Sequence, residues 1–270
     1  MTLDAATRLL AEAGVDNPRA DARLLLAHVL GISRDQTLTA MPTPAQAAQF
    51  AALVTRRASR EPFAYITGQK EFWSLDFEVG PGVLVPRPDT ETLIEEALRI
   101  IADRNASLSI ADLGTGSGAI LIAALKEFPH AQGFGFESSL QAWRYAAANA
   151  ARLIGGRAEI RLEDWAAAQG PFDLVFSNPP YIPSAEIESL APDVFRFEPR
   201  AALDGGPDGL AAYRALAELL PGRLKSGGYA LLEIGQGQAQ AMGTLFSKLE
   251  IVRIAPDLAG IPRCVILRKA

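Results

Sequence analysis

The spacing of apolar residues divides the chain into two parts. Near the N-terminus, apolar side chains recur every three or four positions, the spacing of an amphipathic helix. The first such face consists of Leu3, Ala6, Leu9, Leu10 and Ala13. Gly31 ends a second helical stretch, and Pro18 and Pro44 stand where helices begin. These signals predict a small helical domain over residues 1–70.

An alternating pattern follows between residues 71 and 87. Phe72, Phe77 and Val79 alternate with polar neighbours, which indicates an extended chain. The sequence Gly80-Pro81-Gly82 is typical of a turn. We therefore expect a hairpin linker over residues 71–87, and after it a helix that Asp89 or Thr90 caps.

Beyond residue 105, short apolar runs alternate with helical stretches. The predicted strands are Leu108–Leu113, Gln132–Glu137, Ala158–Glu163, Phe172–Ser177, Gly228–Ile234, Glu250–Ala255 and Arg263–Arg268. This order indicates a mostly parallel sheet covered by helices on both faces. Only about seven residues separate the last two strands, too few for a parallel crossover, so they should pair antiparallel. The predicted fold over residues 88–270 is α/β and Rossmann-like. It resembles the seven-stranded class I S-adenosylmethionine-dependent methyltransferases.

A glycine-rich loop follows the first of these strands and opens a helix. Its residues are Gly114, Thr115, Gly116, Ser117 and Gly118. Glycines let the backbone turn tightly and approach a ligand closely, and free N–H groups at a helix start favour acceptor groups. Together with Ala119 the loop also satisfies the dinucleotide fingerprint, so a nicotinamide-dependent oxidoreductase remains an alternative.

Two acidic residues follow the second and third strands. Glu137 is placed to accept hydrogen bonds from ribose hydroxyls. Asp164 can accept a hydrogen bond from an adenine amino group, and Trp165 can cover the ring face. The structural alternative is a surface acid beside a packed tryptophan. We take Glu137, Asp164 and Trp165 as candidate cofactor contacts.

The segment Asn178-Pro179-Pro180-Tyr181 follows the fourth strand and should face the glycine loop. An Asn amide oxygen and a Pro carbonyl can both accept from a planar NH2 group, and Tyr181 can lie against that group. Two acceptors on an amide or exocyclic amine make its nitrogen more nucleophilic. We therefore expect N-methylation, with Asn178, Pro179 and Tyr181 as catalytic residues and Pro180 as a further substrate contact.

Charge and composition limit the partners, the location and the metal content that we expect for this protein. The net charge of −5 has the wrong sign for a protein that wraps nucleic acid. No apolar run approaches the roughly 18 residues that span a bilayer, and no secretion signal is present, so we expect a cytoplasmic protein. Cys264, His28 and His130 do not form a metal-site pattern, so no metal is expected, and Cys264 should be a buried apolar group.

Three arginines, Arg56, Arg57 and Arg60, lie close together at the end of a predicted helix. They could contact an acidic or RNA-like partner. A solvated helix face is the preferred interpretation.

Several stretches together resemble the peptide chain release factor N5-glutamine methyltransferases of the HemK/PrmC type. They are Pro62–Gly68, Val83–Glu91, the glycine loop, Ser177–Tyr181, Phe197–Leu210 and Asp257–Arg263. Asn-Pro-Pro-Tyr is shared with adenine-N6 DNA methyltransferases, whereas Pro86–Glu91 is much more selective. Asp89 and Glu137 stand where this family usually has Glu and Asp, respectively.

The resemblance implies S-adenosylmethionine as the cofactor, with S-adenosylhomocysteine as its product, held by residues 114–118, Glu137, Trp165 and Asn178. It implies methyl transfer to N5 of the glutamine in the Gly-Gly-Gln motif of class I release factors, which residues 1–70 would help to recognise. No stable contact with nucleic acid or a membrane is implied. The alternatives are an exocyclic-amine (adenine N6-type) DNA or RNA methyltransferase and a translation-factor-binding module without activity.

Overall fold

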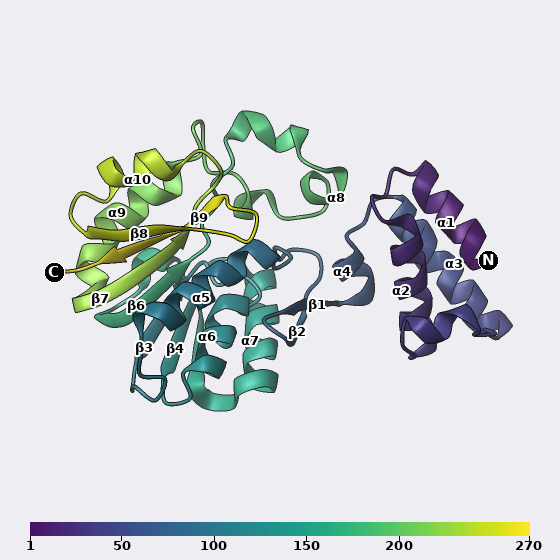
Figure 1. Ribbon diagram of the computed structural model, residues 1–270, viewed down its shortest axis with the longest axis horizontal. Coiled ribbons are helices and arrows are strands. Elements are labelled where there is room, and N and C mark those ends of the chain that lie inside the picture. Colours follow the sequence, from purple (N-terminus) through teal and green to yellow (C-terminus); the bar gives the residue numbers. More distant parts are fainter. The chain divides into compact units, whose positions relative to one another are not determined.

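The computed structural model describes all residues, 1–270, and divides into two compact units (Figure 1). The first unit comprises residues 1–69 and 191–197, and the second comprises residues 70–190 and 198–270. The short helix α8 (Pro192–Phe195) therefore packs with the N-terminal helices, although it lies far along the sequence. Nothing in the hydrophobic pattern indicates this exchange, because residues 191–197 lie inside the expected domain of residues 88–270.

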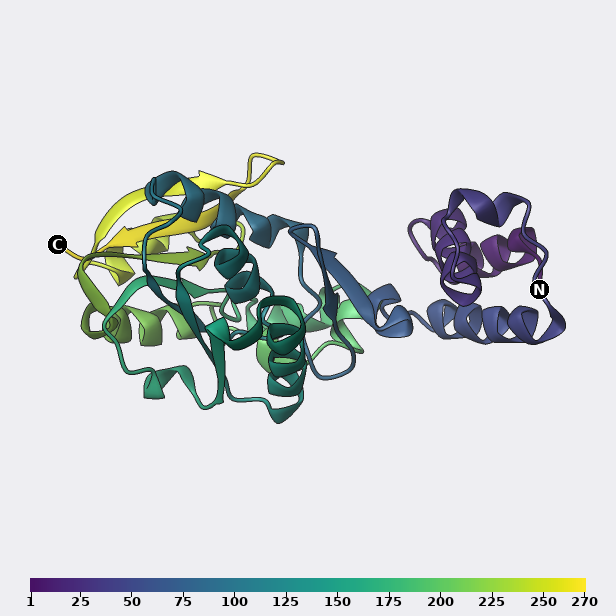
Figure 2. The same cartoon turned by 90° about the horizontal axis from the view of Figure 1, so that it is seen from below.

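The first unit is helical. Its N-terminal elements are α1 (Leu3–Glu12), α2 (Pro18–Leu30), the 3₁₀ turn η1 (Asp35–Leu38), α3 (Pro44–Ala58) and α4 (Phe63–Thr67). Figure 2 shows α1, α2 and α3 as separate coils in the purple part of the chain. Each contributes a side chain to one buried apolar cluster, Leu10 from α1, Leu25 from α2 and Phe50 from α3. Thr43 begins α3 with a capping box to Gln46, which satisfies the first backbone N–H groups of the helix.

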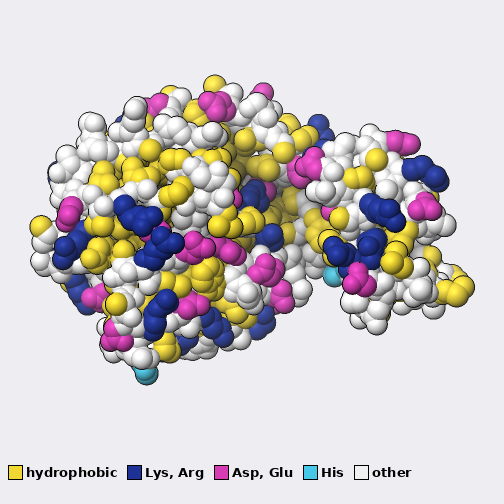
Figure 3. Space-filling model, in the orientation of Figure 1, with side chains coloured by type: hydrophobic (Ala, Val, Ile, Leu, Met, Phe, Trp, Pro, Cys, Tyr) yellow, Lys and Arg dark blue, Asp and Glu magenta, His cyan; other side chains and the backbone are white.

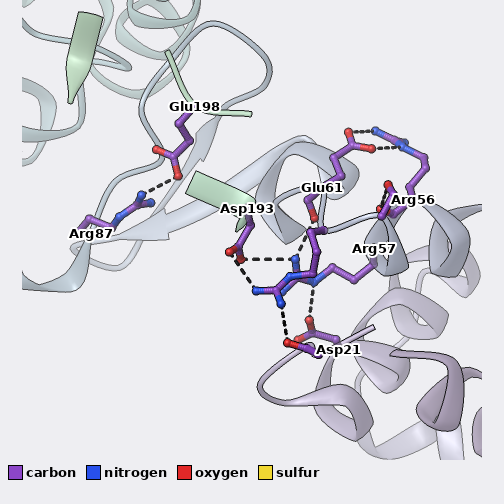
Figure 4. Close-up of polar contacts among 10 residues, drawn as sticks. Asp21, Arg56, Arg57, Glu61, Arg87, Asp193 and Glu198 are labelled. Carbon is purple, nitrogen blue, oxygen red and sulfur yellow. Dashed lines mark hydrogen bonds and ion pairs between the residues drawn. The ribbon is translucent and has the colours of Figure 1, made fainter. Parts of the chain in front are cut away.

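The expectation of a solvated arginine face is wrong for Arg57 and Arg60. The Arg57 side chain is only 8% exposed; its Nε donates to Asp21 Oδ2 at 2.7 Å, and its Nη1 lies 3.5 Å from Asp193 Oδ2 (Figure 4). Arg60 Nη2 donates to the same Asp193 at 3.2 Å. Arg56 alone is largely exposed, and it pairs with Glu61. Two of the three cations thus hold the first unit together.

The hairpin turns at a different place from the one expected. Its strands are β1 (Gln69–Phe72) and β2 (Leu75–Glu78), so the hairpin turn lies at Trp73-Ser74. Gly80–Gly82 does form the expected turn, in which the Val83 N–H donates to the Gly80 carbonyl at 3.3 Å, but this turn does not join the two strands. Both turn residues have positive φ, at 53° and 57°, as a tight hairpin turn requires. Acidic side chains stabilise this unfavourable backbone conformation: Glu91 accepts from the Trp73 N–H at 2.8 Å, and Glu71 accepts from the Ser74 N–H at 2.6 Å.

The second unit is built on a seven-stranded sheet, which confirms the predicted fold. Its strands are β3 (Ser109–Leu113), β4 (Gln132–Glu137), β5 (Ala158–Leu162), β6 (Phe172–Ser177), β7 (Leu224–Glu233), β8 (Glu250–Pro256) and β9 (Pro262–Arg268). Their order is β5-β4-β3-β6-β7-β9-β8. Strands β3 to β7 are parallel, and β9 pairs antiparallel with both β7 and β8, as the short connection required.

Helices cover both faces of this sheet (Figure 1). They are α5 (Glu91–Ile100), α6 (Ala119–Glu127) and α7 (Leu140–Ile154) on one face, and α9 (Ala211–Arg223) and α10 (Ala239–Leu245) on the other. Residues 119–125 of α6 are all buried, which explains why that run is apolar on every side. No helix is long and apolar enough to cross a membrane. The order of the strands reverses between β3 and β6, and a ligand crevice is expected at that point.

Candidate functional site

A pocket of about 300 Å³ opens at the carboxyl ends of β3, β4 and β6. Nine of the predicted site residues line it: Gly114, Thr115, Gly116, Ser117, Glu137, Asp164, Trp165, Asn178 and Pro180. Gly118, Pro179 and Tyr181 do not line it, and the first two are buried. The remaining wall includes residues 82–84, Pro86, Arg87 and Thr90. The structure thus brings together most of the predicted site residues, which lie up to 66 positions apart in the sequence, from Gly114 to Pro180.

The glycine loop turns sharply between β3 and α6. Gly114, Gly116 and Gly118 all have positive φ, at 77°, 57° and 83°, which favours glycine over other residues. Within the loop itself, before the helix begins at Ala119, four N–H groups donate within the protein. Gly114 and Thr115 donate to the Phe136 carbonyl, Gly116 to Glu137, and Gly118 to Thr115. The loop therefore offers a ligand its close backbone approach more than its donors.

Glu137 ends β4 beside this loop and is half-buried. Its Oε2 accepts from the Gly116 N–H at 3.0 Å, and its Oε1 accepts from the Ser139 N–H at 2.8 Å. Each carboxylate oxygen has a second acceptor site, so Glu137 can still accept from ligand hydroxyls while it fixes the loop.

Trp165 and Asp164 also line the pocket. Trp165 packs against the core, and its ring lies close to Gly114, where an added Cβ would be 3.8 Å from Cε3 and Cζ3. Asp164 is exposed and accepts from the Ala166 N–H at 2.8 Å, which begins the 3₁₀ turn η4 (Trp165–Ala167). The structural interpretation, a surface acid beside a packed tryptophan, is therefore correct for this pair. It does not exclude a role as cofactor contacts, because both residues also line the pocket.

Asn178 reaches a partner that the sequence did not suggest. Its Nδ2 donates to Thr90 Oγ1 at 3.3 Å, and the Thr90 hydroxyl donates to Glu233 Oε2 at 2.6 Å. Thr90 makes no side-chain cap on α5, so the expectation that it caps this helix is wrong. The 3₁₀ turn η2 (Pro88–Thr90) runs directly into α5 and supplies the missing backbone contacts instead.

Tyr181 is anchored to the same carboxylate. Its hydroxyl donates to Glu233 Oε1 at 3.0 Å, and burial together with the Glu233 charge raises the pKa of Tyr181. Glu233 is only 1% exposed. Burial raises the pKa of Glu233 as well, against the effect of its hydrogen bonds from Thr90 and Tyr181. A carboxylate this deep is stable only when such donors satisfy it.

A second loop supports the backbone of the Asn178–Tyr181 segment. The Ile182 N–H donates to Leu203 at 3.0 Å, and the Gly205 N–H donates back to Ile182 at 2.8 Å. Gln238 Nε2 donates to the Tyr181 carbonyl at 2.9 Å. Gly209, with φ of 73°, packs so tightly against that carbonyl that a Cβ would collide with it. Residues 203–209 therefore fix the backbone path that follows the fourth parallel strand.

Two of the stretches that resemble a known family, Val83–Glu91 and Phe197–Leu210, meet beside the pocket. Arg87 Nη2 donates to Glu198 Oε1 at 2.6 Å (Figure 4). The Val85 N–H donates to Glu198 Oε2 at 3.2 Å. Glu198 is 7% exposed, and Pro199 next to it lines the pocket. This ion pair holds two stretches 111 positions apart in the sequence against each other.

One further buried acid lies under the glycine loop. Asp112, at the end of β3, is fully buried; Thr115 donates to its Oδ2 at 2.6 Å, while its Oδ1 has no hydrogen-bond partner. Burial raises the pKa of Asp112 to about 7. Cys264, on β9, is buried as expected.

Thr90, Arg87, Asp112, Glu198 and Glu233 are the site residues that the sequence analysis did not single out. Glu233 did carry a signal, because it directly follows the apolar run Tyr229–Leu232 at the end of its strand, and a buried charge occurs only with partners. Thr90 carried none, since a threonine before a helix normally indicates a cap.

Comparison with known proteins matches both units. Residues 2–68 match the PrmC N-terminal domain, and residues 90–206 match the methyltransferase small domain. A release factor glutamine methyltransferase of Rhodospirillum rubrum is 46% identical, covering 99% of this chain and 84% of its own length. One from Bradyrhizobium diazoefficiens is 44% identical, covering 99% and 95%.

Among solved structures, a methyltransferase from Pyrococcus furiosus has a TM-score of 0.54 at 20% identity. The match covers 74% of this chain and 92% of the other, and it shows the fold alone. The full-length sequence similarity decides the family. The chain belongs to the release factor glutamine methyltransferases.

Proposed function

We propose that this protein transfers a methyl group from S-adenosylmethionine to the side-chain amide nitrogen, N5, of the glutamine in the Gly-Gly-Gln motif of class I peptide chain release factors. The observation that carries this proposal is the setting of Asn178. Its amide NH2 is engaged by Thr90, which leaves its oxygen as an acceptor at the pocket for the NH2 of a second amide. Family membership supports the choice of glutamine.

The pocket residues fit S-adenosylmethionine. A Cβ added to Gly116 would meet no protein atom within 4 Å, so this glycine leaves space that belongs to the pocket. Glu137 offers carboxylate oxygens to hydroxyl groups, and Trp165 offers a flat apolar face. When bound, S-adenosylmethionine supplies a methyl group on a cationic sulfur, and the sulfur keeps the electron pair when that bond breaks.

The chain's own residues act on the acceptor amide. The oxygen of Asn178, which lines the pocket, accepts one of its N–H groups, and the carbonyl of Pro179 is the second acceptor once the bound amide brings its other N–H group to this residue, which itself does not line the pocket. Two acceptors favour a pyramidal nitrogen with its lone pair exposed. As the nitrogen–methyl bond forms, the nitrogen becomes cationic and releases one proton to water. An N-methylated amide cation is acidic, so no strong general base is required. Tyr181, held by Glu233, keeps the segment in position.

The surface favours a protein substrate over a nucleic acid. On the face shown in Figure 3, Lys and Arg side chains are interspersed with Asp and Glu and form no continuous basic band. The net charge of −5 agrees with this pattern. Nucleic-acid binding by phosphate neutralisation needs a concentrated positive surface.

A labelling experiment tests the proposal. The protein is incubated with methyl-labelled S-adenosylmethionine and with a class I release factor, the same factor carrying Ala in place of the Gly-Gly-Gln glutamine, or duplex DNA. We expect label on the intact factor alone, and a weak dependence on salt. Labelled adenine with a loss of orders of magnitude between low and physiological salt would instead support the exocyclic-amine alternative.

A further inference from the structure

We propose that Glu233 and Thr90 are positioning residues that fix which end of the Asn178 side-chain amide faces the substrate. The inference deepens the proposed function and rests on the role given there to the Asn178 oxygen. The Asn178 amide can adopt two orientations that differ by a 180° flip, and steric fit does not distinguish them, because the oxygen and nitrogen ends of an Asn amide are nearly identical in size. Only one orientation presents an acceptor to a substrate NH2 group.

The hydrogen-bond polarity of Thr90 makes this choice. Its hydroxyl carries one proton, and that proton is donated to Glu233 Oε2 at 2.6 Å. Toward Asn178, 3.3 Å away, Thr90 Oγ1 can then only accept. An amide oxygen cannot donate, so Asn178 must turn its NH2 group to Thr90. Its oxygen is left for a ligand in the pocket that Asn178 lines.

Glu233 sets the polarity of Thr90 from outside the pocket. It is 1% exposed and does not line the pocket, so it cannot touch the substrate. Its second oxygen accepts from the Tyr181 hydroxyl at 3.0 Å, and its backbone carbonyl accepts from the Tyr213 hydroxyl at 2.9 Å. The carboxylate is thus held from two sides. One buried acid thereby orients both ends of the Asn178–Tyr181 segment, which a carboxylate can do because it is an acceptor at both oxygens.

Removing the acceptor would lift this constraint. Without Glu233, the Thr90 proton can turn toward Asn178 and bind its oxygen, which stabilises the reversed amide. The reversed amide presents NH2 to the substrate NH2 group, and two donors facing each other repel. The consequence is slower methyl transfer with little change in cofactor affinity.

The first test compares three substitutions on one stretch of chain. Thr90→Val keeps the size and removes the hydroxyl, and Thr90→Ser keeps the hydroxyl. Thr92→Val makes the same change at a buried threonine two positions further on, in helix α5, that does not line the pocket. We expect Thr90→Val to lower kcat about tenfold or more, the effect of about 1.4 kcal/mol. Thr90→Ser should recover most of kcat, and Thr92→Val should leave it near the wild-type value. KM for S-adenosylmethionine should stay within about threefold throughout.

A double-mutant cycle separates positioning from general support. If Thr90 acts through Asn178, then Thr90→Val should cause no further loss of kcat, measured in single turnovers, in a protein that already carries Asn178→Ala. Losses that multiply would overturn the inference, as would a Thr90→Val variant with wild-type kcat or a Thr90→Ser variant as slow as Thr90→Val. Should Thr90→Val fail to fold, Thr90→Ala, which removes the hydroxyl together with the methyl group, takes its place in the cycle, with the same two outcomes.

Failure of the proposed function would look different. If Asn178→Ala itself keeps wild-type kcat, the role of the Asn178 oxygen is wrong, and this inference falls with it. If Asn178→Ala is impaired while the Thr90 and Glu233 variants are not, only the positioning role is refuted.

Discussion

Asp193 Oδ1 lies 3.2 Å from Arg60 Nη2, although the two residues are 133 positions apart in the chain. The same carboxylate lies 3.5 Å from Arg57 Nη1. Asp193 belongs to the short segment 191–197, which leaves the second unit after Leu190 and rejoins it at Glu198. One acidic side chain therefore ties this excursion to the N-terminal helices.

Replacing Asp193 by Ala should loosen segment 191–197. Arg57 and Arg60 are 8% and 13% exposed, so the lost bonds are charge-assisted and only partly screened. We expect a cost of about 1–2 kcal/mol for holding the segment to its unit. Hydrogen exchange of its amides should speed up correspondingly. The control is Glu218→Ala, whose ion pair with Lys248 is exposed on both sides and should cost less than about 1 kcal/mol. Equal exchange in both variants would contradict the prediction.

Glu137→Ala should weaken cofactor binding by about 1.5–3 kcal/mol, because a charged acceptor for hydroxyl groups is lost. The loop should also loosen, since Gly116 and Ser139 lose their acceptor. Calorimetry with S-adenosylmethionine measures the change in affinity. Glu159→Ala, at an exposed acid on the neighbouring strand β5, serves as the control and should bind normally. Unchanged affinity of Glu137→Ala would remove Glu137 from the site.

Asp112 should make the stability of the protein without cofactor depend on pH. Its folded-state pKa of about 7 lies above the ordinary 3.8, so the folded protein keeps a proton that the unfolded chain releases. This contribution to stability is complete below about pH 4, and it is lost as pH rises to about 7, by up to about 1.4 kcal/mol per pH unit. Asp112→Asn imitates the protonated form at every pH. We expect urea denaturation to show this variant gaining about 2–3 kcal/mol relative to the wild type between pH 5 and pH 8. A difference independent of pH would contradict the assignment.

Gly209→Ala should impair methyl transfer by displacing Tyr181. The added Cβ would collide with the Tyr181 carbonyl oxygen, and Gly209 also has a positive φ of 73° that disfavours alanine. We expect a lower kcat together with a lower melting temperature. The matched control is Gly243→Ala in helix α10, where a Cβ would meet nothing within 4 Å. That change should stabilise the protein by about 0.5–1 kcal/mol and leave kcat unchanged. Normal activity in Gly209→Ala would show that the loop 203–209 does not position Tyr181.

Local pattern was sufficient for most elements of this protein. Buried parallel strands appear as short apolar runs, so β4 and β6 were predicted at their observed bounds. The short connection between the last two strands, about seven residues by prediction and five in the structure, required the antiparallel pairing of β8 and β9. Glycines and polar residues at strand ends located most of the pocket, because parallel strands bring their carboxyl ends to one edge of the sheet.

The tertiary structure decided what depends on partners far away in the chain. The hairpin turns at Trp73-Ser74, where Glu91 and Glu71 accept hydrogen bonds from the two turn N–H groups, although Gly80–Gly82 has the better local turn sequence. Thr90 binds Glu233, 143 positions away, instead of capping its own helix. Arg57 is buried because Asp21 and Asp193 meet it there. A hydrogen bond or ion pair depends on the positions of both partners, and only the folded chain brings those partners within reach.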